Sequence, residues 1–287
     1  MSLKEIKSRI ASVGNTRKTT SAMKMVSSVK LRKAQQAVQY ALPYVDELDR
    51  ILRGLATMSA FSEVPLLHER PVSRVVIVAF SSDSSLCGGF NSNIVRHTRE
   101  LYQRYSDECE EKPLLFTVGQ KVSDAMHKYD ASTDTSHSNV MSHREYADAA
   151  ALADELTGLY ERGEIDRVVL TYTHFKSAGT QRIVDETLLP LSVQDSQENA
   201  VTSDYILEPS AEKLLEALLP KVIRMKLYSA VLDSYCSEQA ARVIAMQAAT
   251  DNADSLIGEL TLQYNKLRQQ AITNELLDLA GGQIENN

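Results

Sequence analysis

The sequence lacks tryptophan and has few glycines, prolines, cysteines and aromatic residues. Its 287 residues include 11 Gly, 7 Pro and 3 Cys, and aromatic side chains make up 6%. So little Gly and Pro excludes a collagen-like or low-complexity chain and argues against a loop-rich all-β fold. The shortage of aromatic rings argues against a stacking surface for bases or sugars. Three cysteines cannot form a disulfide framework and lack the spacing of metal ligands, so we expect a reducing, intracellular compartment.

The sequence also lacks an apolar run near the ~20 residues that a membrane-spanning helix needs. Residues 1–6 have the pattern of an amphipathic helix rather than of a signal peptide, and no transit segment precedes them. We therefore expect the mature protein to begin at residue 1. With 43% hydrophobic and 24% charged residues, the chain can bury a core in one large domain or two modest ones.

Charge is distributed unevenly along the chain. The net charge is −7, but the first 36 residues carry nine basic side chains and one acidic one, or +8, which leaves −15 on the rest. A basic segment on an acidic protein is open to three interpretations: a nucleic-acid site, an anionic membrane site or a contact with an acidic protein.

The first 58 residues have the apolar repeat of a coiled coil, with steps of three and four residues. This N-terminal seam consists of Leu3, Ile6, Ile10, Val13, Arg17, Thr20, Lys24, Ser27, Leu31, Ala34, Val38, Ala41, Val45, Leu48, Leu52 and Leu55. Its four middle positions, residues 17–27, are polar, while Met23, Met25 and Val26 lie off the seam. We interpret this as a change of partner surface: either the helix breaks or twists there, or that face binds another chain.

A second repeat, the C-terminal seam, runs from residue 215 to residue 271. Ser210 is the expected N-cap of its helix, and Gly281-Gly282 is expected to end it. The seam consists of Leu215, Leu218, Val222, Met225, Ser229, Leu232, Cys236, Gln239, Val243, Met246, Thr250, Ala253, Ile257, Leu260, Tyr264, Leu267 and Ala271.

The central segment has a different pattern, in which expected strands alternate with expected helices. We expect strands at residues 74–80, 114–118, 166–172 and 182–189, and helices at residues 91–105 and 145–162. This alternation predicts a mainly parallel sheet. The predicted fold is α/β plus coiled coil: a long antiparallel two-helix coiled coil from residues 1–58 and 210–287, and a central Rossmann-like α/β domain at residues 72–195. A loop is expected at residues 196–209.

One loop follows the first expected strand, where open α/β sheets bind ligands. Residues 81–91 lack both nucleotide-binding glycine patterns, so we favour a sharp turn that needs Gly88 and Gly89 over a phosphate site. Cys87 lies near a helix N-terminus, which can activate a thiol, but the six histidines are scattered and none is placed as its base. We favour a structural role for this loop and expect no metal and no cofactor.

Several terminal motifs resemble those of the F-type ATP synthase gamma subunit family. They lie at residues 15–26 and 30–35 near the start, and at residues 237–253, 264–269 and 272–278 near the end. The resemblance covers essentially the whole chain and is of the bacterial type, because the cysteine-bearing insert of chloroplast forms is absent. Ser84-Ser85 is a departure, since the family usually has Arg/Lys-Gly before the Leu-Cys-Gly-Gly motif.

The resemblance implies a non-catalytic rotor shaft in the central stalk. Its coiled coil would enter the hexamer of alpha and beta subunits, and the α/β domain would contact the epsilon subunit and the c-ring. The shaft would couple ion-driven c-ring rotation to sequential conformational change in the catalytic beta subunits, for ATP synthesis or hydrolysis. The protein would be peripheral, on the cytoplasmic face of the bacterial plasma (inner) membrane, with no nucleic acid bound.

Matched positions imply two sets of interface residues. The c-ring contact would include Tyr205 and Glu208. Three residues of the rotor–beta contact have a second interpretation: Arg242 and Gln269 as bridges between the two helices, and Met23 as ordinary packing. Alternatives from other classes are a coiled-coil adaptor or DNA-binding protein and an enzyme acting through Cys87, and neither accounts for the terminal motifs. The rotor–beta contact would include Met23, Lys24, Arg242, Arg268, Gln269, Thr273 and Glu275.

Overall fold

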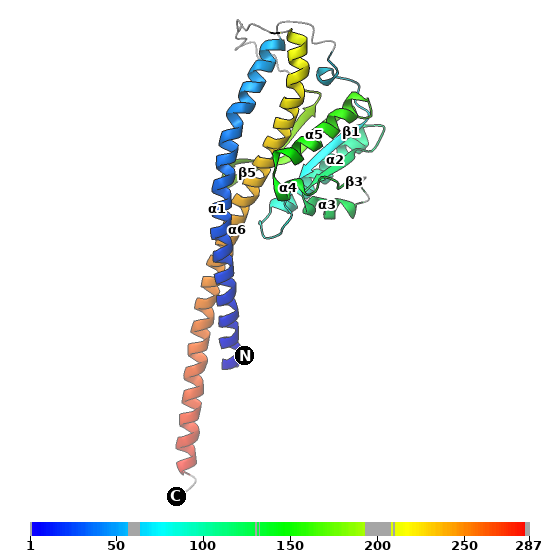
Figure 1. Ribbon diagram of the computed structural model, residues 1–287. Coiled ribbons are helices and arrows are strands. Elements are labelled where there is room, and N and C mark those ends of the chain that lie inside the picture. The colour runs from blue at the N-terminus through cyan, green and yellow to red at the C-terminus, as the bar shows by residue number, and fades with distance from the viewer. Residues whose placement is uncertain are drawn as a thin grey trace. The chain divides into compact units, whose positions relative to one another are not determined.

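The computed structural model describes residues 2–56, 64–129, 131, 133–192, 208 and 210–284. The chain forms two compact units: residues 1–28 with 242–287, and residues 29–241. Two long helices, α1 (Leu3–Ala56) and α6 (Ala211–Ile284), each run through both units (Figure 1). Because α1 is continuous, one of the alternatives left open by the sequence, a break of the helix where its seam becomes polar, is wrong.

Local hydrogen bonds fix the starts of both long helices. Ser2 and Glu5 form a capping box, in which the Ser2 amide donates to Glu5 Oε2 (2.7 Å) and the Glu5 amide donates to Ser2 Oγ (3.3 Å). Ser210 is the N-cap of α6, as predicted, since its Oγ accepts from the Lys213 amide at 3.4 Å. The predicted stop at Gly281-Gly282 was wrong, because α6 continues to Ile284. Gly inside a helix costs only about 1 kcal/mol relative to Ala, which α6 tolerates near its end.

The first unit is an antiparallel pair of helices. Thr20 of α1 and Thr250 of α6 share a hydrogen bond of 2.9 Å between their hydroxyl groups, and Arg17 pairs with Asp254 at 2.5 Å. Residue numbers rise along α1 as they fall along α6, so the helices run in opposite directions. Ile6 and Leu260, on the two seams, are 1% and 3% exposed.

The second unit contains a five-stranded sheet with the order β3-β2-β1-β4-β5. The strands are β1 (Val75–Phe80), β2 (Leu114–Val118), β3 (Thr133–Asp134), β4 (Arg167–Ser177) and β5 (Thr180–Leu189). The first four are parallel to one another, and β5 pairs antiparallel with β4. The four strands expected from the sequence are all present, and the sheet is mainly parallel.

Within the part of the chain that the structure describes, four shorter helices and one short 3-10 helix accompany the sheet. Helices α2 (Phe90–Glu108) and α5 (Tyr146–Glu161) were predicted from the sequence. Helices α3 (Gln120–His127) and α4 (Val140–His143), the 3-10 helix η2 (Pro65–Leu67) and strand β3 were not. The missed elements are short, so they carry too few residues for a periodic pattern.

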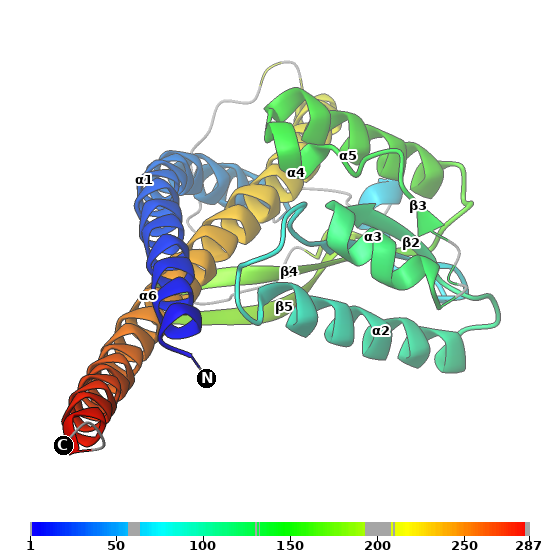
Figure 2. The same cartoon turned by 90° about the horizontal axis from the view of Figure 1, so that it is seen from below.

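Both faces of the sheet are covered. Val76, Val78 and Phe80 of β1 pack in a core with α5 and with the parts of α1 and α6 that belong to this unit. The alternate residues of β1 pack in a second core with α2 and α3. Figure 2 shows α2 and α5 on opposite sides of the strands. A central strand buried on both faces explains why residues 75–80 are continuously apolar.

Candidate functional site

The loop after β1, a candidate ligand site in the sequence, is filled by the chain's own side chains. The Ser82 amide donates to Asn91 Oδ1 at 3.1 Å, and Asn91 Nδ2 donates to Cys87 Sγ at 3.1 Å. Cys87 is 1% exposed, which closes its sulfur to a substrate. The structure therefore favours the structural interpretation of this loop over the phosphate and nucleophile interpretations.

The same loop accommodates the departure from the family pattern. Left-handed backbone occurs at Leu86 (φ 68°) and Gly88 (φ 60°), and Ser85 is not among the residues with positive φ. Only positive φ makes glycine hard to replace on conformational grounds. Ser85 therefore fits the position at which the family usually has Gly without backbone strain.

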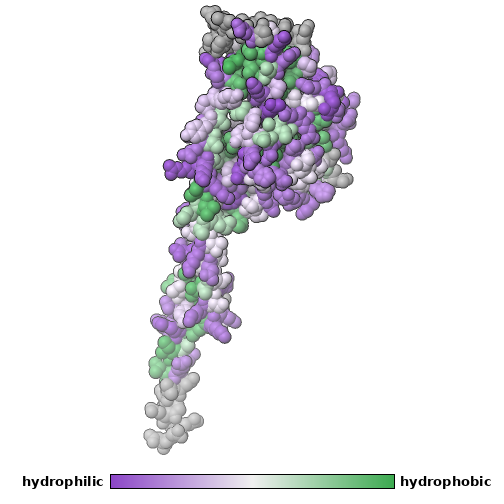
Figure 3. Space-filling model, viewed as in Figure 1, coloured by the Kyte–Doolittle hydropathy of each residue, from purple (hydrophilic) through white to green (hydrophobic). Residues whose placement is uncertain are grey.

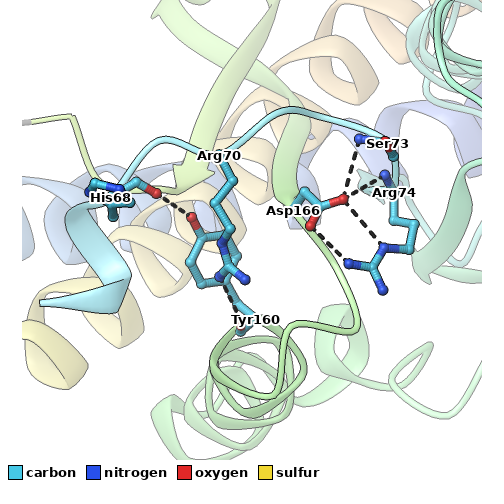
Figure 4. A network of polar contacts seen from close by, with 6 residues as sticks. All are labelled: His68, Arg70, Ser73, Arg74, Tyr160 and Asp166. Atoms are coloured by element: carbon cyan, nitrogen blue, oxygen red, sulfur yellow. Dashed lines mark hydrogen bonds and ion pairs between the residues drawn. The ribbon is translucent and has the colours of Figure 1, made fainter.

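A polar network ties the segment between α1 and β1 to the sheet (Figure 4). Asp166 accepts hydrogen bonds from the Ser73 amide (3.2 Å), from the Arg74 amide (2.9 Å) and from the Arg74 guanidinium (3.0 Å at Nη2). Burial alone would raise the pKa of Asp166, but the hydrogen bonds from Arg74 and Ser73 together hold it below its ordinary value. The carboxylate therefore stays ionised and anchors the start of β1.

Tyr160 of α5 anchors the same segment nearer to its start, at His68 and Arg70. Its hydroxyl donates to the His68 carbonyl at 2.9 Å, and its own carbonyl accepts from Arg70 Nη2 at 2.7 Å. The Arg70 guanidinium also lies over the Tyr160 ring, 4.1 Å from its centroid. These contacts attach the connection between α1 and β1 to α5.

The polar middle of the N-terminal seam still faces α6. Arg17 and Thr20 pair with Asp254 and Thr250, so the predicted change of partner surface was wrong for these two positions. Ser27 is 3% exposed. Polar groups at seam positions that find partners on the facing helix set the register of a coiled coil.

Among the described residues of the first unit, no other helix accompanies α6 beyond the start of α1. From the Arg17–Asp254 pair, fourteen residues back along α1 reach Leu3, and fourteen forward along α6 reach Arg268. The part of α6 after Arg268 therefore extends past the start of α1, and Figure 1 shows its red end beyond the N-terminus. We call residues 268–284 the tip.

The tip exposes large apolar side chains. Ile272, Leu276 and Leu277 are 48%, 61% and 63% exposed. They lie off the C-terminal seam, so the apolar repeat did not reveal them. Their helical spacing was the available signal, because residues 272 and 276 are four apart and share a face. Residues 272 and 276 therefore give the tip an exposed apolar face.

The residues expected at the rotor–beta contact fall into two groups. Arg268, Gln269, Thr273 and Glu275 all lie exposed at the tip, where the Thr273 hydroxyl donates to the Gln269 carbonyl at 2.9 Å. Met23 and Lys24 are partly buried, and Arg242 is 7% exposed. Residues 242 and 268 are separated by 26 positions of one helix, roughly 39 Å. The structure therefore does not gather the seven residues at one place.

Of the two residues expected at the c-ring contact, Tyr205 lies outside the described residues. Glu208 is described and exposed.

On the face seen in Figure 3, hydrophobic residues lie among hydrophilic ones along the helix pair of the first unit. No cluster of three or more His, Cys, Asp or Glu side chains able to hold a metal ion occurs within the described ranges.

Comparison with known proteins identifies the family. The sequence model of the ATP synthase family matches residues 2–284. The ATP synthase gamma chain of Bacteroides fragilis is 48% identical over 287 residues, which cover 99% of each chain. That of Phocaeicola vulgatus is 46% identical over 286 residues, again 99% of each. The chain belongs to the family of ATP synthase gamma chains.

A more distant gamma chain and two solved structures are also similar to this chain. The ATP synthase gamma chain of Flavobacterium johnsoniae is 40% identical over 281 residues, 98% of this chain and 97% of that one. A chain in the Euglena gracilis mitochondrial ATP synthase (OSCP/F1/c-ring, rotational state 3) has the same fold, with a TM-score of 0.66 over 97% of this chain and 92% of that one at 19% identity. A chain of the Tetrahymena thermophila central stalk/c-ring has a TM-score of 0.58 at 25% identity, over 80% and 99% of the two chains.

Family membership fits the helices that the structure describes. Among the described residues, neither α1 nor α6 nor any shorter helix has a stretch both long and apolar enough to cross a bilayer. The gamma chain is part of a membrane-associated complex.

Proposed function

We propose that this chain is the rotor shaft in the central stalk of an F-type ATP synthase and is not itself catalytic. It couples ion-driven rotation of the c-ring to sequential conformational change in the catalytic beta subunits. Family membership over the whole chain supports this role, together with relatives that are named ATP synthase gamma chains.

The observation that carries the proposal is the exposed apolar tip, where α6 extends past the start of α1. A lone helical end that exposes Ile272, Leu276 and Leu277 needs an apolar environment supplied by another protein. The alpha–beta hexamer supplies it as a sleeve around the tip. Apolar contact is non-directional, so the tip is held on its axis and can still turn.

Rotation requires contacts that favour one catalytic interface at a time, since a conformational equilibrium shifts only when contacts differ between states. Two helices of different sequence provide this asymmetry, because each side of the pair presents different side chains. The proposed contacts with beta are the tip group, at Arg268, Gln269, Thr273 and Glu275, and the group at Met23, Lys24 and Arg242.

The sheet-containing unit is proposed to lie at the foot of the shaft. There it contacts the epsilon subunit and the c-ring, with Tyr205 and Glu208 at the c-ring contact. We place the complex on the cytoplasmic face of a bacterial inner membrane. The division into helices at residues 1–58 and 210–287, a domain at 72–195 and a loop at 196–209 is part of this proposal.

Reconstitution tests the role directly. Purified alpha and beta subunits are assayed for ATP hydrolysis with and without this chain. We expect a sustained rise in hydrolysis, one copy of the chain per six large subunits, and no hydrolysis by the chain alone. Salt-sensitive binding to duplex DNA without association with the hexamer would instead support the DNA-binding alternative.

Met23→Lys tests the proposed contact group in α1. Met23 is partly buried, and a new positive charge there changes the surface offered to beta. We expect fewer ions pumped per ATP hydrolysed in vesicles, with normal assembly. Ala11→Lys, which adds the same charge at an exposed position of the same helix, is the matched control. Equal ion-to-ATP ratios in Met23→Lys and the control would contradict the assignment.

A further inference from the structure

Strand β4 is longer than β1, its parallel neighbour. β1 pairs with residues 167–171 of β4, whereas β4 extends to Ser177. β5 pairs with the opposite edge of β4 from Val168 to Ser177, with two register shifts. Beyond Thr171, therefore, none of the described strands pairs with the edge of β4 that faces away from β5. Backbone groups on such an edge need other partners when they are buried.

Two side chains of α6 supply those partners. The Phe175 amide donates to Asp233 Oδ1 at 2.8 Å, and Ser237 Oγ donates to the Thr173 carbonyl at 2.9 Å. A neighbouring strand would offer the same pair, one acceptor and one donor. We call this arrangement the edge clamp.

The spacing of the edge clamp follows from the geometry of a helix beside a strand. Asp233 and Ser237 are four residues apart on one helical face, a rise of about 6 Å. Thr173 and Phe175 are two residues apart on one strand edge, a rise of about 6.7 Å. The two distances agree closely enough for both bonds to form without distortion of either element.

A third bond completes the edge clamp. His174, between the two clamped strand residues, has its Nδ1 at 2.6 Å from Asp233 Oδ2, so both carboxylate oxygens are engaged. Asp233 is 9% exposed, Ser237 is fully buried, and Thr173 is 5% exposed. Two turns earlier, Lys226 lies 3.7 Å from Glu186 of β5, which adds an attachment to the other strand of the hairpin.

The edge clamp adds directional hydrogen bonds to the apolar packing around it. Leu227, Ala230 and Val231 of α6 already pack in the core of this unit. The interdigitated apolar side chains hold α6 in place and resist its rotation about its own axis, but they make no directional bond to the strand. Hydrogen bonds to fixed backbone groups are directional and oppose that rotation.

We propose that Asp233 and Ser237 are positioning residues that lock α6 against rotation relative to β4, so that the sheet-containing unit and the C-terminal helix turn as one body. The inference rests on the proposed rotor function, because only a rotor loads this junction with torque. Asp233 carries two of the three bonds and is the main attachment.

The test uses the assembled complex with the hexamer immobilised and a probe on the sheet-containing unit. The angular spread of the probe is recorded while the rotor is stalled. Asp233→Ala leaves one of three bonds, so we expect the angular variance to rise by up to about threefold, the limit for three equal springs reduced to one. ATP-driven ion pumping in vesicles should then fail at a smaller opposing gradient, with hydrolysis retained.

Matched variants separate positioning from general weakening. Asp233→Asn keeps an acceptor for the Phe175 amide and should restore most of the stiffness. Asp185→Ala removes another aspartate paired with a histidine, His97 of α2, which does not involve α6, and should leave the angular spread unchanged. Ser237→Ala removes a single hydroxyl and should broaden the spread less than Asp233→Ala.

The outcomes are distinct. An angular spread in Asp233→Ala equal to that of wild type or of Asp185→Ala overturns the proposal. If Asp233→Ala does not assemble, Ser237→Ala decides: a broadened spread supports the edge clamp and an unchanged one overturns it. Failure of the wild-type chain to assemble with alpha and beta would instead reject the rotor function itself.

Discussion

Replacing Asp166 should destabilise the sheet-containing unit in a way that depends on pH. Its side chain is 7% exposed, and its Oδ2 accepts from both the Ser73 and Arg74 amides. A hydrogen bond to a charged group contributes about 1.5 kcal/mol or more. Asp166→Ala loses both main-chain bonds, so we expect the free energy of unfolding to fall by about 3 kcal/mol. Asp166→Asn keeps one oxygen for both amides and should cost about 1 kcal/mol.

The pH dependence follows from the lowered pKa of the Asp166 carboxyl in the folded chain. The unfolded chain then binds the proton more readily than the folded one. The stabilisation is therefore complete above the ordinary carboxyl pKa of about 3.9 and is lost as pH falls below it through the lowered pKa. The difference between wild type and Asp166→Ala should shrink over that acid range.

Urea unfolding followed by circular dichroism in the tyrosine region measures both effects, because the chain has 12 Tyr and no Trp. Glu164→Ala is the control. Glu164 pairs with Arg162, but both side chains are more than half exposed, so its loss should change the free energy of unfolding by less than about 0.5 kcal/mol. Equal losses for Asp166→Ala and Glu164→Ala at neutral pH, or a loss that persists unchanged in acid, would refute the reasoning.

Three further predictions concern other parts of the chain. Gly119→Ala should lower the free energy of unfolding in urea by about 3 kcal/mol or more, because Gly119 has φ +104° and a Cβ there would collide with a main-chain carbonyl. Gly179→Ala, with open space around it, should lower it little, and similar losses in the two variants would contradict this. In a variant that keeps Cys236 as the only thiol, this cysteine should react with a disulfide reagent at mildly alkaline pH only after denaturation, because burial raises its pKa to about 12. Rapid labelling of Cys236 in the folded chain would disprove this prediction. Thr20→Val should lower the free energy of unfolding by no more than about 1 kcal/mol in thermal unfolding, because the Thr250 hydroxyl that it leaves still donates to the Met246 carbonyl at 2.7 Å; a loss of about 3 kcal/mol, as for an orphaned buried group, would contradict this.

The long-range pattern of the fold was predictable because it repeats. None of the seventeen C-terminal seam positions is exposed, and among the N-terminal seam positions only Arg17 is, where it pairs with Asp254. A repeat sustained over many turns outweighs local preferences such as those of the proline inside each long helix. The same repeat says nothing about residues off the seam, which is why the exposed apolar tip had to come from the structure.

The segment from residue 119 to residue 144 could not be predicted because contacts from elsewhere fix its short elements. Helix α3 has 8 residues, α4 has 4 and β3 has 2. Gly119 makes its close turn against the end of β1, and the Gly119 amide donates to the Ser138 carbonyl at 3.2 Å. These constraints join residues that no local periodicity connects.

Isolated aspartates hold backbone ends together at three places in the second unit. Asp166 accepts from amides at the start of β1, Asp233 accepts from the Phe175 amide near the end of β4, and Asp83 accepts from the Gln120 amide at the start of α3. The partners are separated by 92, 58 and 37 residues. In each case a carboxylate takes the place of the backbone acceptor that regular secondary structure does not supply there. The sequence shows these aspartates beside many solvated acidic residues of the same type, so composition and spacing cannot separate them. The loop after β1 illustrates the difference: its glycines indicated a turn, but only the fold shows that Asp83 in that same loop fixes the next helix.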